Sequence, residues 1–254
     1  MKITRAVVPS LFTVLNIFCG FLSILNASQG KIELAAWFII LAAGFDAFDG
    51  VMARITRSSS QFGVELDSLS DVVSFGAAPS FLVYRAYLVN FDNIGVLIAA
   101  MPLVFGAIRL ARFNVQLVGF DKDYFSGLPI PMQAMTVCAF ILQYYSEGFG
   151  LQGWTRDALA PMVVVLSLLM VSRVRYDTLP KFTRRGVKAH PWRAMTFLLG
   201  ALMVVASQGR LWFAIIVTFI LFGIVRSAYG SLHRLLAKVE KEADDETEVS
   251  SVDI

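Results

Sequence analysis

Four aspartates lie close together in a chain that is otherwise strongly apolar. They are Asp46, Asp49, Asp67 and Asp71, and they fall in DAFDGVMAR (46–54) and GVELDSLSD (63–71), which join hydrophobic segments. A carboxylate near lipid is costly and is normally retained where it has a function. Hard divalent cations prefer carboxylate oxygens as ligands. The four residues therefore predict a site for Mg²⁺ or Mn²⁺ at a membrane surface.

Helical spacing places these carboxylates on two faces that can meet. Asp46 and Asp49 are one turn apart, and Gly63, Asp67 and Asp71 form a stripe at intervals of four residues. The intervening TRSSSQ (56–61) is short enough to join two antiparallel helices. Four carboxylates that converge in this way repel one another unless cations neutralise them. The chain has no clustered cysteine or histidine, which argues against zinc.

Small residues and an arginine accompany the acidic residues. Gly50, Ala53 and Gly63 leave room for a bulky ligand to approach the helix backbone. Arg54 adds a planar guanidinium, which suits phosphate. Carboxylates, small residues and an arginine together indicate a pyrophosphate-binding site. Two other interpretations stay open, namely an ion or proton pathway in a transporter and structural pairing of the carboxylates with arginines.

The composition indicates an all-α, polytopic integral membrane protein. Of its 254 residues 57% are hydrophobic and 16% are charged, and the mean hydropathy is +0.66. A soluble domain has about 25% charged residues. A bilayer span needs about 20 helical residues. Eight segments approach that length, at 8–27, 32–55, 63–88, 94–115, 129–147, 156–172, 193–208 and 211–231.

We therefore expect about eight transmembrane helices that form one membrane domain over residues 1–238. The acidic, polar tail at 239–254 has too little apolar content to fold alone, so we expect it to be disordered. The small net charge of +3 gives no reason to predict a nucleic-acid partner.

The basic residues predict how the helices are oriented. If all eight segments span and the N-terminus is cytoplasmic, most of the 22 lysines and arginines face the cytoplasm. The residues left on the opposite side are Lys31, Arg85, Arg156 and Arg210. This asymmetry follows the positive-inside rule. We therefore expect both termini and the acidic residues on the cytoplasmic side of the inner membrane or its equivalent.

The two acidic stretches resemble the signature of the CDP-alcohol phosphatidyltransferase family. That signature reads D-x-x-D-G-x-x-A-R, eight residues, then G-x-x-x-D-x-x-x-D. Its fixed positions are filled here by Asp46, Asp49, Gly50, Ala53, Arg54, Gly63, Asp67 and Asp71. The stretches SFGAAPS (74–80), RLARFN (109–114) and GLPIP (127–131) are similar to the membrane-embedded phosphatidylserine synthase branch. PSLFTVLNIFCGF, which contains Asn16, also looks similar.

The resemblance implies transfer of the phosphatidyl group from CDP-diacylglycerol to L-serine, with release of CMP. By the family pattern one cation is held by Asp46, Asp49 and Asp67 and a second by Asp46, Asp67 and Asp71. Asp71 is also the implied general base. The CDP-lipid site would be lined by Asp49, Gly50, Ala53, Arg54, Ser60 and Gly63. A homodimer is implied as well.

Other branches of the family remain alternatives, with glycerol phosphate, inositol phosphate or phosphatidylglycerol as acceptor. An ion-coupled transporter is the alternative from a different class.

The carboxylate of serine requires cationic or amide donors. Arg109, Arg112 and Asn114 are expected at the cytoplasmic end of the fourth segment, level with the acidic residues. Arg109 and Arg112 are one turn apart and share a face. We predict that these residues, with Asn16 from the first segment, bind serine. For the two arginines, anchoring of the helix end or pairing with an aspartate is the alternative.

Overall fold

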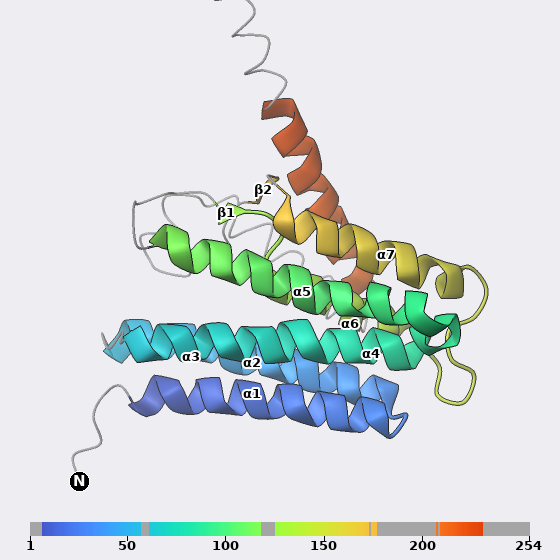
Figure 1. Ribbon diagram of the computed structural model, residues 1–254, viewed down its shortest axis with the longest axis horizontal. Helices are drawn as coiled ribbons and strands as arrows, with labels where there is room; N and C mark the ends of the chain where they lie inside the picture. Colours follow the sequence, from blue (N-terminus) through green and yellow to red (C-terminus); the bar gives the residue numbers. More distant parts are fainter. Residues whose placement is uncertain are drawn as a thin grey trace, which may run out of the picture.

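The protein is a bundle of helices that lie side by side (Figure 1). The structure, a computed structural model, describes residues 7–56, 61–117, 125–172, 174–176, 207 and 209–230. The elements are α1 (Val7–Ser28), α2 (Ile32–Thr56), α3 (Gln61–Asp71), the π-helix η1 (Val72–Ala77), α4 (Ala78–Ala86), the 3₁₀ turn η2 (Leu88–Phe91), α5 (Asp92–Leu117), α6 (Ile130–Tyr144) and α7 (Trp154–Val171). A further apolar helix covers Trp212–Gly230. The predicted all-α architecture is confirmed.

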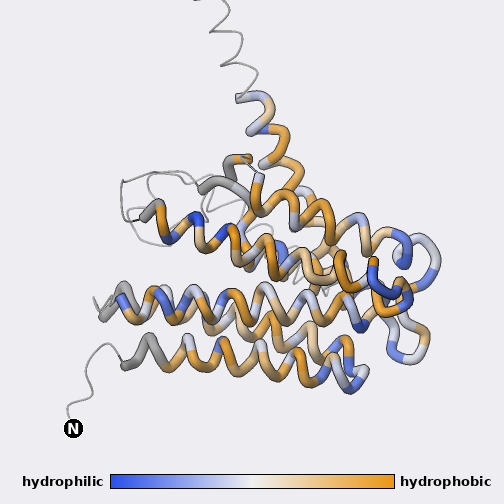
Figure 2. Tube along the Cα trace, in the orientation of Figure 1, coloured by the Kyte–Doolittle hydropathy of each residue, from blue (hydrophilic) through white to orange (hydrophobic). Residues whose placement is uncertain are grey.

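Within the described residues, 5 helices are long and apolar enough to cross a membrane: Leu11–Ser28, Ile32–Met52, Leu88–Val115, Trp154–Val171 and Trp212–Gly230. Figure 2 shows the long hydrophobic stretches on these helices. The predicted spans at 63–88 and 129–147 are also helical but are not among the five. Helix α6 is too short to cross a membrane alone, because its 15 residues cover only about 22 Å of a hydrocarbon core of about 30 Å.

The predicted span at 193–208 lies, apart from Ser207, outside the described residues, and so does the tail at 239–254. The count of eight spans therefore stays a prediction.

The third predicted segment forms one run of helix with a widened turn in its middle. Helix α3 passes into η1 and then into α4, and the N–H of Ala78 bonds to the carbonyl of Val73, five residues back. Pro79 follows at the start of α4. Proline lacks an N–H, and its ring clashes with the carbonyl four residues earlier in a regular α-helix. The wider turn accommodates this proline, and such turns are frequent at functional sites.

Helix α6 lies inside the bundle and is positioned by the end of α7. A two-residue antiparallel pairing joins β1 (Phe125–Ser126) to β2 (Arg175–Tyr176). Next to it the N–H of Gly127 donates to the carbonyl of Val174 at 2.9 Å, and the N–H of Leu128 donates to that of Leu169 at 3.0 Å. The second bond satisfies one of the carbonyls that a helix end leaves unpaired. The GLPIP stretch thereby fixes where α6 begins.

Gly127 cannot carry a side chain without disturbing this junction. Its φ is +85°, and an added Cβ would collide with the carbonyl oxygen of Met170. Gly148 has a similar φ of +89°, but a Cβ there would meet nothing within 4 Å. An alanine substitution at Gly148 therefore measures the cost of backbone conformation alone, whereas one at Gly127 adds the cost of a steric clash.

We predict that Gly127→Ala lowers the unfolding temperature in detergent much more than Gly148→Ala does. Both variants pay about 1–2 kcal/mol for a left-handed conformation, and only Gly127→Ala adds about 1–3 kcal/mol of overpacking. Thermal unfolding of the two purified variants measures the difference. Equal losses in both would contradict the close junction between the start of α6 and the end of α7.

Candidate functional site

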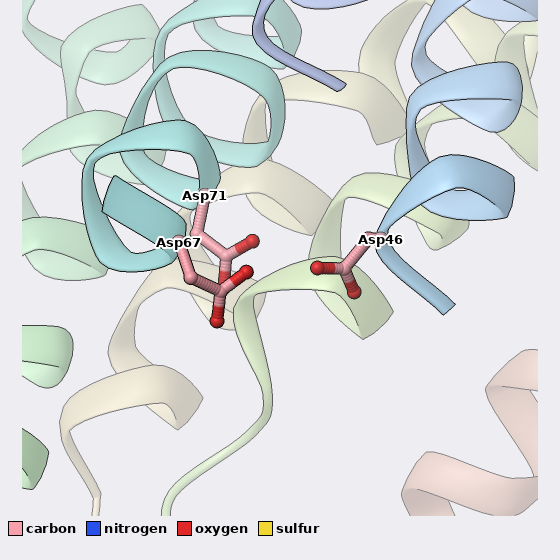
Figure 3. A group of neighbouring side chains, drawn as sticks. All are labelled: Asp46, Asp67 and Asp71. Carbon is pink, nitrogen blue, oxygen red and sulfur yellow. The ribbon is translucent and has the colours of Figure 1, made fainter. Parts of the chain in front are cut away.

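Three of the four aspartates converge between α2 and α3. Asp46 comes from α2, and Asp67 and Asp71 come from α3, where they lie one turn apart. One carboxylate oxygen from each lies within 4.8 Å of the others. Figure 3 shows the side chains of Asp67 and Asp71 extending from one helix toward Asp46 on the other. The short connection at 57–60 lies outside the described residues, but the two helices run in opposite directions as predicted (Figure 1).

The donor set of this cluster fits a hard divalent cation. All of its ligand atoms are carboxylate oxygens, which Mg²⁺ and Mn²⁺ prefer. One oxygen of Asp71, Oδ1, is buried and has no hydrogen-bond partner among the described residues. A buried carboxylate oxygen without a donor is costly, and a cation would satisfy it. The cluster can therefore hold a metal ion.

Asp49 is not part of this group of three. Its side chain is buried, and its Oδ2 accepts a hydrogen bond from the hydroxyl of Thr13 on α1. In this structure Asp49 therefore bonds to α1. Its predicted role as a cation ligand stays a prediction. The hydroxyl of Thr13 was not among the residues predicted from the sequence.

Helix α1 holds the two acidic helices in register. The hydroxyl of Ser70 donates to the carbonyl of Thr13 at 3.3 Å, and that of Ser74 donates to the carbonyl of Asn16 at 2.9 Å. A Cβ on Gly20 would lie 2.8 Å from Cα of Ser74, so only glycine permits this approach. A stripe of small and polar residues at helical spacing in this apolar segment would have indicated the contact between α1 and the helix of Ser70 and Ser74. The stripe consists of Thr13, Asn16, Gly20 and Ser23.

The residues predicted to line the CDP-lipid site are only partly described. Gly50 is exposed, and a Cβ there would meet nothing within 4 Å, so there is open space beside this residue. Gly63 is half-buried on α3. The side chains of Ala53 and Arg54, and the whole of Ser60, lie outside the described part of the chain.

Of the predicted serine-binding residues on α5, Arg109 is the one that lies at the acidic cluster. Arg109 and Asp71 interact electrostatically, and Nε of Arg109 is buried without a hydrogen-bond partner among the described residues. Arg112 instead donates to the carbonyl of Val171 at 3.3 Å, at the end of α7. The amide of Asn114 donates to the hydroxyl of Ser68 at 3.0 Å and so ties α5 to α3.

Asn16 is completely buried on α1, and neither atom of its side-chain amide has a hydrogen-bond partner in the described part of the chain. Its position along the bundle follows from its neighbours. Its carbonyl bonds to Ser74, one turn after Asp71, and it lies one turn after Thr13, which bonds to Asp49. The Asn16 side chain is therefore level with the acidic cluster.

Residues 6–172 match the family model described as CDP-alcohol phosphatidyltransferase. This matched region contains the acidic cluster, α1 and the whole of α5. The chain belongs to the CDP-alcohol phosphatidyltransferase family. The resemblance predicted from the acidic signature is confirmed.

Several curated relatives are similar over most of the chain. CDP-diacylglycerol–serine O-phosphatidyltransferase of Helicobacter pylori is 41% identical over 173 residues, which cover 68% of this chain and 73% of the relative. Archaetidylserine synthase of Methanothermobacter thermautotrophicus is 40% identical, with 69% and 72% covered. CDP-diacylglycerol–serine O-phosphatidyltransferase of Bacillus subtilis is 33% identical, with 73% and 98% covered.

The fold also resembles a solved structure, that of Mycobacterium tuberculosis phosphatidylinositol phosphate synthase with CDP-DAG bound. The TM-score is 0.51 at 20% sequence identity, and the match covers 66% of this chain and 83% of the other. At this identity the likeness supports a common fold and no more.

We predict that Asp67→Asn weakens Mn²⁺ binding by roughly 100-fold or more, because the cluster loses a charged ligand. Without metal the same variant should unfold at a higher temperature than the parent protein, because it removes repulsion among carboxylates. Titration calorimetry with Mn²⁺ and thermal unfolding in the presence of a chelator measure the two effects.

Glu65→Gln is the matched control, since Glu65 is exposed on the same helix and loses the same charge. It should change neither property. Equal Mn²⁺ affinity in Asp67→Asn and Glu65→Gln would rule out the cluster as a metal site.

Proposed function

We propose that the protein transfers the phosphatidyl group of CDP-diacylglycerol to L-serine, which yields phosphatidylserine and CMP. The observation that carries this proposal is the cluster of Asp46, Asp67 and Asp71, which occupy signature positions of the family and lie within 4.8 Å of one another. The serine acceptor is supported by the relatives named CDP-diacylglycerol–serine O-phosphatidyltransferase, at 33–42% identity over 68–73% of this chain.

Two divalent cations, Mg²⁺ or Mn²⁺, would neutralise the pyrophosphate and stabilise the CMP leaving group. One cation would be held by Asp46, Asp67 and Asp71. The second is assigned to Asp46, Asp49 and Asp67, and Asp49 would then exchange its hydrogen bond with Thr13 for the metal. As the family resemblance implies, the CDP group would be bound by Asp49, Gly50, Ala53, Arg54, Ser60 and Gly63.

The reaction is a direct displacement at phosphorus. The serine hydroxyl oxygen forms a bond to the phosphorus that carries diacylglycerol, and the bond from that phosphorus to the oxygen of CMP breaks. Asp71, the last aspartate of the acidic stripe, would accept the hydroxyl proton, which is the role that the family pattern implies for it. No covalent intermediate with the protein is required.

Arg109 and Asn16 are the side chains proposed to bind serine itself. The guanidinium of Arg109 is beside Asp71, so a serine whose hydroxyl reaches Asp71 can place its carboxylate on Arg109. The amide of Asn16 is buried at the same level and has unused donor and acceptor capacity among the described residues. Arg112 and Asn114 have a structural role in this proposal, because each holds α5 to a neighbouring element.

The membrane orientation remains part of the proposal. The asymmetry of lysine and arginine supports about eight spans, with both termini and the acidic cluster on the cytoplasmic side. L-serine and CDP are charged and water-soluble groups, so an active site at the cytoplasmic surface gives them access. Assembly as a homodimer is implied by the family resemblance alone.

The activity is tested by incubating the purified protein with CDP-diacylglycerol, Mn²⁺ or Mg²⁺ and a panel of alcohols. We expect release of CMP with L-serine and none with glycerol phosphate, inositol phosphate or phosphatidylglycerol. Asp71→Asn should lower the rate by about 10²–10⁴-fold, the usual contribution of a general base. CMP release with another alcohol alone would overturn the serine assignment, and none with any alcohol would favour a transporter.

Arg109→Lys should raise the KM for serine by roughly tenfold and leave the KM for CDP-diacylglycerol within about twofold, because lysine cannot bind a carboxylate through two parallel hydrogen bonds. Arg112→Lys is the matched control on the same helix and should leave both values unchanged. Initial rates of CMP release at varied serine concentration give the result. If the KM for serine rose more in Arg112→Lys than in Arg109→Lys, serine binding would be assigned to Arg112 instead.

A further inference from the structure

Gln133 on α6 is a fully buried polar side chain without a partner in the described part of the chain. It is 0% exposed, and neither its amide oxygen nor its amide nitrogen makes a hydrogen bond there. Gln143, on the same helix, is exposed and donates to the hydroxyl of Tyr144 at 3.3 Å. Burying an amide with its hydrogen bonds unmade is costly. The side chain of Gln133 therefore calls for a partner beyond the described residues, and a bound ligand can supply it.

The packing of α6 places Gln133 on the inner side of the acidic cluster. Helix α6 contacts both α2, which carries Asp46, and η1, which begins directly after Asp71. A Cβ on Gly106 of α5 would lie 3.6 Å from Cδ1 of Ile130, so these two residues are at one level. Arg109 lies one turn after Gly106 on α5, and Gln133 lies one turn after Ile130 on α6. Because the two helices are antiparallel, these steps lead in opposite directions along the bundle.

The direction of α6 makes the Gln133 side chain lean toward the level of the cluster. Helix α6 starts at the end of α7, where Leu128 bonds to Leu169, and so runs antiparallel to α5 and α7. Gln133 and Arg109 are therefore about 9 Å apart along the bundle axis at the level of the backbone. Side chains in an α-helix lean toward its N-terminus. This lean brings the amide of Gln133 back toward the level of Arg109 and Asp71.

Buried polar atoms that have no hydrogen-bond partner among the described residues come to this level from three helices. They are both amide atoms of Asn16, Nε of Arg109 and both amide atoms of Gln133. The set includes hydrogen-bond donors and acceptors. A small zwitterion offers an ammonium donor and a carboxylate acceptor together, so one such molecule can satisfy both kinds of atom. A phosphate group by itself offers acceptors only, and a neutral hydroxyl offers weaker hydrogen bonds than an ammonium or a carboxylate does.

We propose that Gln133 forms the inner wall of the acceptor site and determines specificity for a hydroxy-amino acid. Its amide oxygen accepts a hydrogen bond from the ammonium group of the acceptor, while Arg109 binds the carboxylate. Acceptors without an ammonium group lack this charge-assisted hydrogen bond to the buried oxygen and are disfavoured. The inference rests on the proposed transfer to serine and adds the residue that selects the amino group.

The test uses the full-length protein with CDP-diacylglycerol and Mn²⁺, and the variants Gln133→Leu and Gln133→Met. Both remove the amide and keep a similar volume. We expect the KM for serine to rise roughly tenfold or more, the usual effect of losing a hydrogen bond to a charged group. The KM for CDP-diacylglycerol should stay within about twofold. Gln143→Leu is the matched control on the same helix and should change neither value.

Thermal unfolding without ligand separates binding from a structural role. We expect Gln133→Leu to unfold at the same or a higher temperature than the parent protein, because the variant no longer buries an unpaired amide. The stabilisation of the parent protein by added L-serine should be largely lost in both Gln133 variants and kept in Gln143→Leu. This measurement does not depend on turnover.

Two results would overturn the inference. One is a serine KM within about twofold of the parent value in both Gln133 variants. The other is a fall of about 5 °C or more in the ligand-free unfolding temperature of both, which would make Gln133 a residue of the core. If the parent protein itself releases no CMP with serine, the proposed function fails, and that result is seen before any variant is compared.

Discussion

Mutual repulsion among the carboxylates of Asp46, Asp67 and Asp71 is the constraint on which the arrangement of this bundle depends. With oxygens within 4.8 Å of one another, each pair of charges repels by about 3 kcal/mol at an effective dielectric constant near 20. This repulsion opposes the approach of α2 to α3. The approach must therefore be maintained by contacts made elsewhere, and a cation between the two helices would turn the opposing term into an attractive one.

Helix α1 supplies those contacts. Thr13 bonds to Asp49 on α2, and the backbone of the same helix accepts hydrogen bonds from Ser70 and Ser74 on the other side of the cluster. Gly20 lets the two backbones come close. Arg109 adds a fixed positive charge beside Asp71. The hydrogen bonds of Ser70 and Ser74 to α1 and the close packing at Gly20 do not depend on the metal, and they hold the acidic site in place.

The acidic residues could be predicted from the sequence because their chemistry is local. The intervals among Asp46, Asp67 and Asp71, read with a helical period, are enough to put them on facing surfaces, and long apolar runs are enough to predict the helices. The contact between Thr13 and Asp49 and the different partners of Arg109 and Arg112 could not be predicted. Each depends on the register between segments far apart in the chain, which side-chain packing determines.

The most direct test of this account is the position of the metal in the assembled protein. A crystal structure with Mn²⁺ and CDP-diacylglycerol, measured at the manganese absorption edge, would locate the ion by its anomalous scattering. The account predicts manganese between Asp46, Asp67 and Asp71, with the diphosphate of the CDP-lipid in contact with it. Manganese bound elsewhere, or a CDP-lipid diphosphate bound away from the three aspartates, would contradict it.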